Sequence, residues 1–418
     1  MKLRNHGRTS ADLIFFNIQL DTVPLGVHIS PIKMKPTIRP SPVESAKEVG
    51  LRYVHDHRPG ITRERVGRGF RYRGPDGRII GDRPTLKRIE GLVIPPAWEN
   101  VWICPLENGH LQASGRDDRN RKQHLYHTRW REVRDETKFH RLVDFGRVLP
   151  SIRHRLKKDL TREGLCREKI IATVVRLLEI SLIRVGNEES ARDNHTYGLT
   201  TMENRHAVVR GASIRFHFLG KSNKEHVVEI HDPRIARIIQ ACQHLRGQEL
   251  FHYVNDSGEK HPVGSHDVND YLRDVSGEDF TAKEFRTWGG TLSVLKELRK
   301  MGPAAHVTQG RKNLVTAIRA AAQHLGNTVA VCRKSYIHPA VLESYLEGTL
   351  IPTLEKLTGT SKSKPNGHLH VDEVVLLEFL AFNNQQKNGR KQTPATGNVP
   401  KGTREIRPAQ RAGLNRRK

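Results

Sequence analysis

The chain has few cysteines, and they lie far apart. Its 418 residues include four, and no two of them form a CxxC pair: Cys104, Cys166, Cys242 and Cys332. This spacing excludes a zinc ribbon and a disulfide scaffold, and it favours a reducing compartment. No run approaches the roughly 18 apolar residues needed to cross a membrane. The short apolar patch at residues 13–16 lacks the cleavage site of a signal peptide, so nothing indicates export.

Two further absences bear on cofactors. There is no GxxxxGK[ST] motif, which removes the usual phosphate-binding loop for ATP. The 23 histidines are scattered, and groups such as His252, His261 and His266, or His124 and His127, have no supporting cysteines or carboxylates. We therefore expect neither a metal nor an organic cofactor. Asp117 and Asp118 are adjacent within a basic run, so we interpret them as local ion-pair partners.

Acidic residues are also scarce relative to basic ones. The chain has 45 Asp and Glu against 71 Lys and Arg, a formal charge of +26 and a pI near 10.2. An excess spread over the whole chain predicts a polyanionic partner, above all nucleic acid. On composition alone, a ribosomal or membrane-surface protein is the alternative.

The chain divides into four parts. Residues 1–47 contain five prolines and little periodicity, which predicts a weakly ordered extension. Residues 48–133 have short β-type runs broken by turn signals, and residues 134–385 are mostly helical in pattern. Residues 386–418 hold ten Lys or Arg and one acid, which predicts a disordered basic tail that attracts phosphates. The fold class is therefore α+β.

Several elements can be predicted within these parts. Residues 69–80 indicate a hairpin that turns at Pro75-Asp76-Gly77, and residues 100–115 another at Glu107-Asn108-Gly109. Residues 167–184 and 313–325 have helical apolar periodicity, the first with one buried face and the second ending before Gly326. Residues 213–230 alternate around a Gly-Lys-Ser-Asn turn, a hairpin with Lys221 at its tip. A further short helix is predicted over 371–379.

The stretch that points to chemistry is HLGNTVAVCRKSYIHP, residues 324–339. It places Tyr336 nine residues after Asn327 and directly behind Arg333 and Lys334. A phenol with a pKa of about 10 is a poor nucleophile at neutral pH. In a cationic pocket that faces a phosphate, it can nevertheless attack and retain the broken strand as an ester.

Strand cleavage through tyrosine needs three further functions. Guanidinium groups bind the non-bridging oxygens of the transition state. A mobile lysine can protonate the departing 5′ oxygen, and a hydrogen-bond donor holds the remaining oxygen. Candidates occur in order along the chain: Arg184, Lys221, Arg286 and Asn327. Tyr345 is a rival nucleophile, but it lies on an apolar-periodic helix and is predicted to be core.

Several separate motifs resemble the type IB DNA topoisomerases of the small poxvirus and bacterial kind. The N-terminal part contains PGITRERVGRGFRYRGPDG and GLVIPPAWENVWICP, followed by GRDDRNRKQHLYHTRWREVRDETKF. The C-terminal part contains RVGNEES, HTYGLTT, FLGKS, KEFRTWGGT and GNTVAVCRKSYIHP. The resemblance covers roughly residues 54–350 and extends more weakly to the last predicted helix.

The resemblance implies roles for the candidate residues. Arg184 and Arg286 would bind the scissile phosphate, Lys221 would be the general acid, and Tyr336 would form a 3′-phosphotyrosyl bond. Asn327 stands where many relatives have a histidine, which predicts a weaker donor and less sensitivity to pH. In RKQHLYH, the resemblance places Gln123 and Tyr126 against the duplex and Arg121 on its backbone. His124 stands where relatives often have a tyrosine.

The function implied is ATP- and metal-independent relaxation of supercoiled DNA by a bacterial-type, cytoplasmic, nucleoid-associated monomer that closes two lobes around the duplex. A tyrosine recombinase is the nearest alternative, since it uses a similar pocket. Recombinases usually have a histidine three residues before the second arginine, where this chain has Lys283, and a helical rather than β-rich N-terminal domain. A non-catalytic architectural DNA binder is the alternative from another class, and it would not depend on Tyr336.

Overall fold

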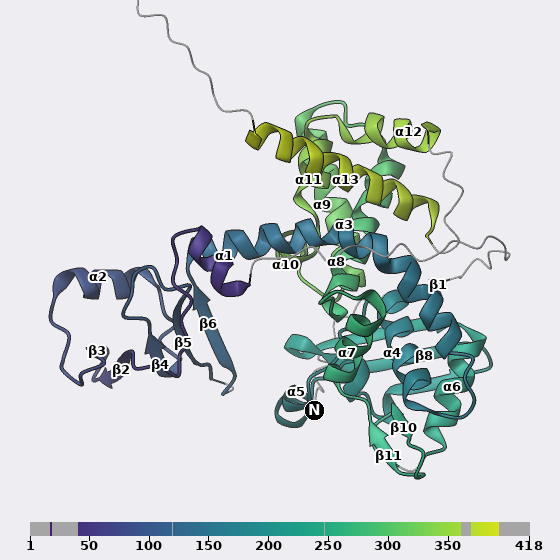
Figure 1. Cartoon of the computed structure of the whole chain (residues 1–418), viewed down its shortest axis with the longest axis horizontal. Coiled ribbons are helices and arrows are strands. Elements are labelled where there is room, and N and C mark those ends of the chain that lie inside the picture. Colours follow the sequence, from purple (N-terminus) through teal and green to yellow (C-terminus); the bar gives the residue numbers. More distant parts are fainter. Residues whose placement is uncertain (1–16, 19–40, 119, 246, 361–368, 393–418) are drawn as a thin grey trace, which may run out of the picture.

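The chain folds into two lobes joined by one long helix. The computed structural model describes residues 17–18, 41–118, 120–245, 247–360 and 369–392. Figure 1 shows a sheet-rich N-terminal lobe at one side and a larger helical lobe at the other, with α3 (Thr128–Asp159) running from the first into the second. This confirms the predicted α+β class. Most of the two predicted terminal segments, 1–47 and 386–418, lies outside the described residues.

The N-terminal lobe is built on a five-stranded antiparallel sheet. Its order is β3-β2-β4-β5-β6, with strands β2 (Ile61–Val66), β3 (Gly69–Arg73), β4 (Glu99–Ile103), β5 (Leu111–Arg116) and β6 (Lys122–Tyr126). The predicted β4–β5 hairpin is confirmed. The other predicted hairpin is shorter than expected, and β3 also pairs with the preceding strand β2 across a turn at Gly67, which has φ +59°. The predicted turn at Pro75-Asp76-Gly77 is present: Arg73 and Ile79 form an antiparallel bridge, with hydrogen bonds from the Gly74 amide to the Arg78 carbonyl and from the Ile80 amide to the Tyr72 carbonyl.

Two short helices complete this lobe. Helix α2 (Arg83–Gly91) covers the sheet with Ile89, which packs with Ile61 and Ile103. Helix α1 (Pro42–Glu48) begins inside the segment predicted as a weakly ordered extension. A capping box between Ser41 and Glu44 starts it, and Ala46 packs with Leu51 and Trp130 in a small apolar cluster. Since Trp130 belongs to α3, the joining helix is part of this lobe's core.

The helical lobe has its core around α4 (Arg167–Ser181). Nine of its residues are buried, including Thr173 and Ser181, so the helix is enclosed almost all round. The prediction of a single buried face was therefore wrong. Around it lie α3, α6 (Pro233–Gln243), α7 (Ser265–Ser276) and α8 (Ala282–Met301). The small hairpin β10 (His252–Val254) and β11 (Lys260–Pro262) also contacts this region.

A second sheet lies against this helical core. The predicted hairpin is confirmed as β8 (Ser213–Gly220) and β9 (Lys224–His231), joined by a 3-10 turn at Lys221–Asn223. Strand β7 (Ala207–Arg210) adds to β8, and β1 (Asn17–Ile18) pairs in parallel with β9. Short helix α5 (Glu188–Asn194) lies in the loop between α4 and β7.

The C-terminal half continues as helices. Helix α9 (Val307–His324) begins earlier than predicted and ends before Gly326, whose φ of +61° fits the predicted glycine after the helix end. It is followed by α10 (Val329–Tyr336), α11 (Pro339–Leu346) and α12 (Leu350–Thr360). Helix α13 (Val371–Gln392) is longer than the predicted 371–379 and extends past the predicted domain end at 385.

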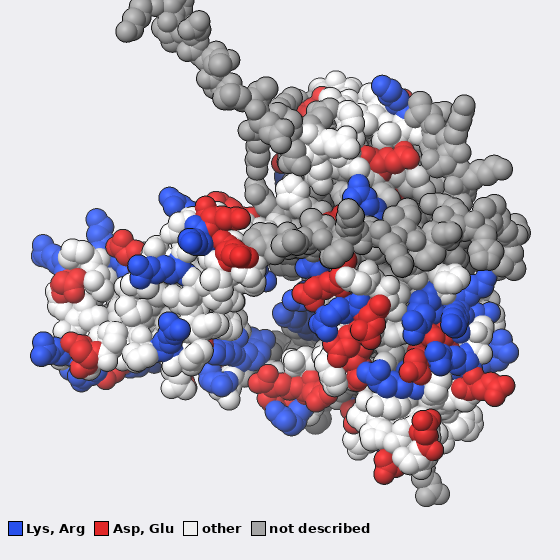
Figure 2. Space-filling model, viewed as in Figure 1, with Lys and Arg blue, Asp and Glu red and all other residues white. Residues whose placement is uncertain are grey.

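Charge is mixed on the surface shown in Figure 2. Lys and Arg are numerous on both lobes, with Asp and Glu interspersed among them. The described helices include none that is long and apolar enough to cross a membrane.

Candidate active site

Tyr336 is the last residue of α10, and α8 fixes its main chain. Thr291 Oγ1 donates to the Tyr336 carbonyl at 3.1 Å and accepts from the His338 amide at 3.1 Å. Gly290 allows this close approach, because a Cβ there would lie 3.0 Å from the Tyr336 carbonyl oxygen. The KEFRTWGGT motif thus supplies the surface on which the tyrosine rests.

Arg286, one turn earlier on α8, lies beneath the tyrosine ring. It is 5% exposed, and its guanidinium carbon is 4.9 Å from the ring centroid of Tyr336. Its Nη1 donates to the Leu182 carbonyl and its Nη2 to the Leu325 carbonyl, the latter at 2.8 Å. These two carbonyls fix the plane of the guanidinium. Its Nε is buried with no hydrogen-bond partner among the described residues.

Arg184 follows the end of α4, on a loop held in an unusual conformation. Leu182 has φ +54°, which is strained for a branched side chain and turns the chain sharply out of the helix. The loop is then fixed by the HTYGLTT motif, since Leu199 donates to the Arg184 carbonyl at 2.9 Å. Gly198 is required there, because a Cβ would lie 2.6 Å from that carbonyl oxygen.

Asn327 connects Arg184 to the end of α9. Its side-chain Oδ1 accepts from Arg184 Nη2 at 2.6 Å, and its main-chain amide donates to the Ala322 carbonyl at 2.9 Å. Its side-chain Nδ2 is buried and has no partner in the described part of the chain. Two buried donors, Asn327 Nδ2 and Arg286 Nε, therefore remain available for an acceptor that the protein itself does not supply.

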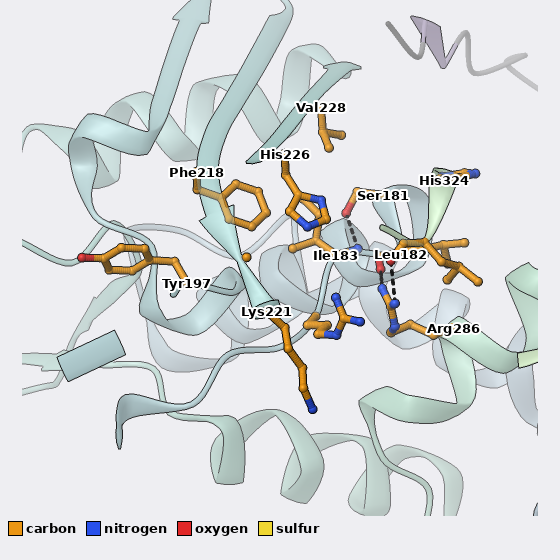
Figure 3. Close-up of a pocket in the computed structure, with 13 residues that line it drawn as sticks. Ser181, Leu182, Ile183, Tyr197, Phe218, Lys221, His226, Val228, Arg286 and His324 are labelled. Carbon is orange, nitrogen blue, oxygen red and sulfur yellow. Dashed lines mark hydrogen bonds between the residues drawn. The ribbon is translucent and has the colours of Figure 1, made fainter. Parts of the chain in front are cut away.

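Lys221 lies at the end of the β8–β9 hairpin. Together with Arg184 and Arg286 it lines a small cavity of about 20 Å³, and Figure 3 shows its side chain extending away from the ring of His226. Lys221 is exposed. The hairpin and the Arg184 loop are tied together, because the Tyr197 amide donates to the Leu219 carbonyl at 2.7 Å. The fold thus brings the five predicted residues to one region, with Lys221 at its edge.

The charges at this site act on the phenol. Burial raises the pKa of Tyr336, but the charge of Arg286, followed by those of Arg184 and Lys138, outweighs it, so the pKa lies below the ordinary value. Burial and the nearby Arg184 lower the pKa of Arg286 to about 10. Arg286 therefore stays charged at neutral pH, and the phenol has more phenolate character than a free tyrosine.

Two histidines of the cavity were not predicted from the sequence. His226 stacks on Phe218 with a centroid distance of 5.0 Å and lies against Gly220 and Gly326. Burial and the charges of Arg184 and Arg286 lower its pKa to about 4. Burial and the charge of Arg286 likewise lower the pKa of His324 to about 4. A histidine five residues after a hairpin lysine carries no sequence signal of its own, and its place here depends on the packing of β9 against the α9–α10 turn.

Arg333 and Lys334, which precede Tyr336 in the sequence, are both exposed on α10. The cations that lower the pKa of its phenol, Arg286, Arg184 and Lys138, come from other elements. One of them is Lys138 on α3, to which no role was assigned from the sequence. Tyr345 is 2% exposed, and its hydroxyl contacts Asn313 at 2.7 Å and the Gly302 carbonyl at 2.9 Å. The prediction that Tyr345 belongs to the core is confirmed.

The four residues predicted to contact DNA lie on or beside edge strand β6. Arg121 and Gln123 both bind Asp117, at 2.6 Å and 2.9 Å, so the prediction of local ion pairing by Asp117 is confirmed. His124 is exposed, and its ring lies nearly parallel to that of Tyr126, with centroids 5.9 Å apart. Among the described residues, no three His, Cys, Asp or Glu gather as a metal-binding group.

Comparison with known proteins gives matches along most of the described chain. Residues 127–356 match the model for the catalytic core of eukaryotic DNA topoisomerase I, and residues 69–117 match that for the N-terminal domain of bacterial DNA topoisomerase IB. The DNA topoisomerase 1B of Acanthamoeba polyphaga mimivirus is 32% identical over 294 residues, 68% of this chain and 87% of that protein. The DNA topoisomerase 1 of Rabbit fibroma virus (strain Kasza) is 24% identical over 327 residues, which cover 70% of this chain and 94% of that protein. A match to the DNA topoisomerase 1 of Schizosaccharomyces pombe covers 41% of this chain at 25% identity and 20% of that protein.

Proposed function

The chain belongs to the type IB DNA topoisomerase family, and from this premise we propose that it relaxes supercoiled duplex DNA as a monomer without ATP or metal. One observation carries the proposal. Arg286 lies against the ring of Tyr336 and Arg184 binds Asn327, while Arg286 Nε and Asn327 Nδ2 are buried without a hydrogen-bond partner among the described residues. Buried donors are rarely left unpaired, and the non-bridging oxygens of a phosphodiester are acceptors of matching charge.

The proposed reaction exchanges one phosphate ester for another. Tyr336 Oη attacks the phosphorus, the phenol proton is released, and the bond from phosphorus to the 5′ oxygen breaks. Lys221 protonates the departing oxygen, which leaves as an alcohol, while the other strand end is retained as a 3′-phosphotyrosyl ester. After strand rotation, the 5′ hydroxyl reverses these steps. Two guanidinium groups supply the charge that stabilises the transition state.

The proposed DNA surface lies on the N-terminal lobe. Arg121, Gln123, His124 and Tyr126 come from β6 and the turn before it, and β6 is the sheet edge from which α3 leads to the helical lobe. Asp117 holds Arg121 and Gln123, so DNA binding would exchange these contacts for contacts to phosphates and bases.

The test is plasmid relaxation in EDTA without ATP. We expect the wild-type protein to relax supercoiled plasmid and Tyr336→Phe to leave it supercoiled. Tyr345→Phe removes a phenol hydroxyl from the next helix; it is the matched control and should retain activity. Trapping with detergent should give a protein–DNA adduct that depends on Tyr336. The proposal fails if the wild type leaves the plasmid supercoiled, or if Tyr336→Phe relaxes it equally well.

A further inference from the structure

Two consecutive residues of α3 contact the chain on both sides of Tyr336. The Lys138 ammonium donates to the carbonyl of Ser335 and lies 5.5 Å from the ring centroid of Tyr336. Phe139 packs edge-on against His338, with centroids 5.3 Å apart. Helix α3 therefore contacts the tyrosine segment in addition to α8.

These contacts fix the position of the tyrosine main chain and do not involve its hydroxyl. Lys138 binds the carbonyl of Ser335, and Thr291 of α8 binds that of Tyr336 itself. Both contacts are to main-chain atoms, so they determine where the Cα of Tyr336 lies. A phosphoryl transfer with its entering and leaving oxygens in line is sensitive to this position, since a displacement of about 1 Å can cost roughly a hundredfold in rate.

We propose that Lys138 is a positioning residue of the strand-cleavage reaction, which anchors the main chain beside Tyr336 and directs the phenol toward the phosphorus. The inference rests on the proposed function, because it assigns Tyr336 as the nucleophile. Lys138 acts through the tyrosine, so its loss slows cleavage and religation alike and leaves DNA affinity unchanged.

Electrostatics supports the same role. Removal of the Lys138 charge takes away one of the cations that lower the pKa of Tyr336, so the phenol should ionise at higher pH. Burial lowers the pKa of Lys138 itself. The charged groups that face these two side chains come from three elements: Arg286, Lys283 and Glu284 on α8, Arg184 after α4, and Asp135 on α3.

The experiment compares Lys138→Met, Lys138→Arg and Lys157→Met in the full-length protein. Lys157→Met removes the same charge from an exposed position on the same helix and is the control for net charge. Single-turnover cleavage and religation of a duplex oligonucleotide are measured as a function of pH, with DNA affinity measured separately.

We expect Lys138→Met to slow both steps by about ten- to a hundredfold, the effect of losing a hydrogen bond to a charged group. Its rate profile should bend at higher pH than that of the wild type. Lys138→Arg should recover most of the rate, and Lys157→Met should match the wild type.

The inference is overturned if Lys138→Met cleaves within twofold of the wild type, if its loss lies in DNA affinity, or if Lys157→Met is slowed equally. Titration of the Tyr336 phenol in the absence of DNA tests the contact with Lys138 independently of whether the protein cleaves DNA. The phenolate absorbance of Tyr336 is obtained by subtracting the Tyr336→Phe form of each variant. If the wild type forms no adduct, the proposed function fails. The titration alone then decides whether Lys138 acts on Tyr336, and an unshifted curve counts against it.

Discussion

Lys221 differs from the other four candidate residues in its freedom. Arg184, Arg286, Asn327 and Tyr336 are held by contacts on at least one side, whereas Lys221 is exposed on a 3-10 turn that includes Ser222 at φ +67°. A residue that delivers a proton to a departing oxygen must reach it only in the transition state, so an exposed lysine on a strained turn suits this step.

Lys221→Ala is expected to slow cleavage of ordinary DNA by about a hundred- to ten-thousandfold, the usual contribution of general acid catalysis. A substrate with a 5′-thiolate leaving group needs no protonation and should be cleaved at nearly the wild-type rate. Lys224→Ala removes a neighbouring lysine of the same hairpin and should affect both substrates equally. Equal losses of Lys221→Ala on the two substrates would remove Lys221 from this role.

The two neutral histidines at the site predict a simple dependence of the cleavage rate on pH. His226 and His324 have pKa values of about 4, below the ordinary 6.5, so they stay neutral as the pH falls from about 7.5 to 5.5. We expect the logarithm of the wild-type cleavage rate to follow one straight line in this range. A bend near pH 6.5 would show that one of these histidines titrates.

Asn327→His should introduce such a bend. An imidazole there accepts from Arg184 only while it is neutral, so protonation as the pH falls removes the contact that Asn327 Oδ1 now makes at 2.6 Å. The rate should therefore fall with decreasing pH by about tenfold relative to the wild type. A profile parallel to that of the wild type would contradict this.

At the scale of elements, α13 joins the helical lobe through a buried acid as well as through buried apolar residues such as Leu376 and Phe379. Glu373 is 3% exposed and forms a bidentate pair with Arg153 of α3 at 2.8 Å and 2.8 Å. It also accepts from Trp288 of α8 at 3.2 Å. Trp288 lies two residues after Arg286, so the last described helix contacts the element that carries a proposed active-site arginine.

Glu373→Gln should destabilise the helical lobe by about 1.5–3 kcal/mol, because buried Arg153 loses a charged hydrogen-bond partner, although Glu179 still compensates its charge. Asp372→Asn, one residue earlier, breaks a partly exposed pair with Arg299 and should cost less than about 1 kcal/mol. Chemical denaturation of both variants measures the difference. Equal losses would show that burial of Glu373 does not matter.

The elements also show what could be predicted from the sequence. The β8–β9 hairpin and the glycine that ends α9 follow local patterns, so they were predicted correctly. The enclosure of α4 depends on neighbours distant in sequence, so the prediction of one buried face was wrong. The β2–β3 pairing is local, across Val66 and Gly69, and was missed because the Pro75-Asp76-Gly77 signal pointed to the next turn. At the site, ordered motifs identified the five candidates. Lys138 and His226 were missed because their proximity to Tyr336 and Arg184 arises only when α3 and β9 pack against the α9–α10 region.

At the scale of the whole molecule, the net positive charge is denser at the two ends of the chain than between them. Residues 1–40 carry six Lys or Arg and two acids, and residues 386–418 carry ten and one. These segments together hold half of the formal charge of +26. Electrostatic attraction to DNA should therefore depend on them as much as on the two lobes.

A truncation after Gln392 keeps all of α13 and removes seven Lys or Arg and one acid. If these residues contact phosphates, the slope of log affinity against log salt should become shallower by up to about 6. Cleavage of bound DNA should not change, because the active site is intact. An unchanged slope would show that the tail does not bind phosphates.

Helix α3 belongs to both lobes, with consequences for how DNA is released. Trp130 is part of the N-terminal core, and Arg134 lies 5.6 Å from the Tyr126 ring centroid. Only three residues separate Arg134 from Lys138, which contacts the tyrosine segment. If the lobes part, α3 must bend within this single turn or Lys138 must leave Ser335. Separation of the lobes and displacement of Tyr336 would then be coupled, so the protein could not cleave DNA while its lobes are apart. Faster amide exchange at residues 135–137 in the DNA-free protein than in the complex would report it.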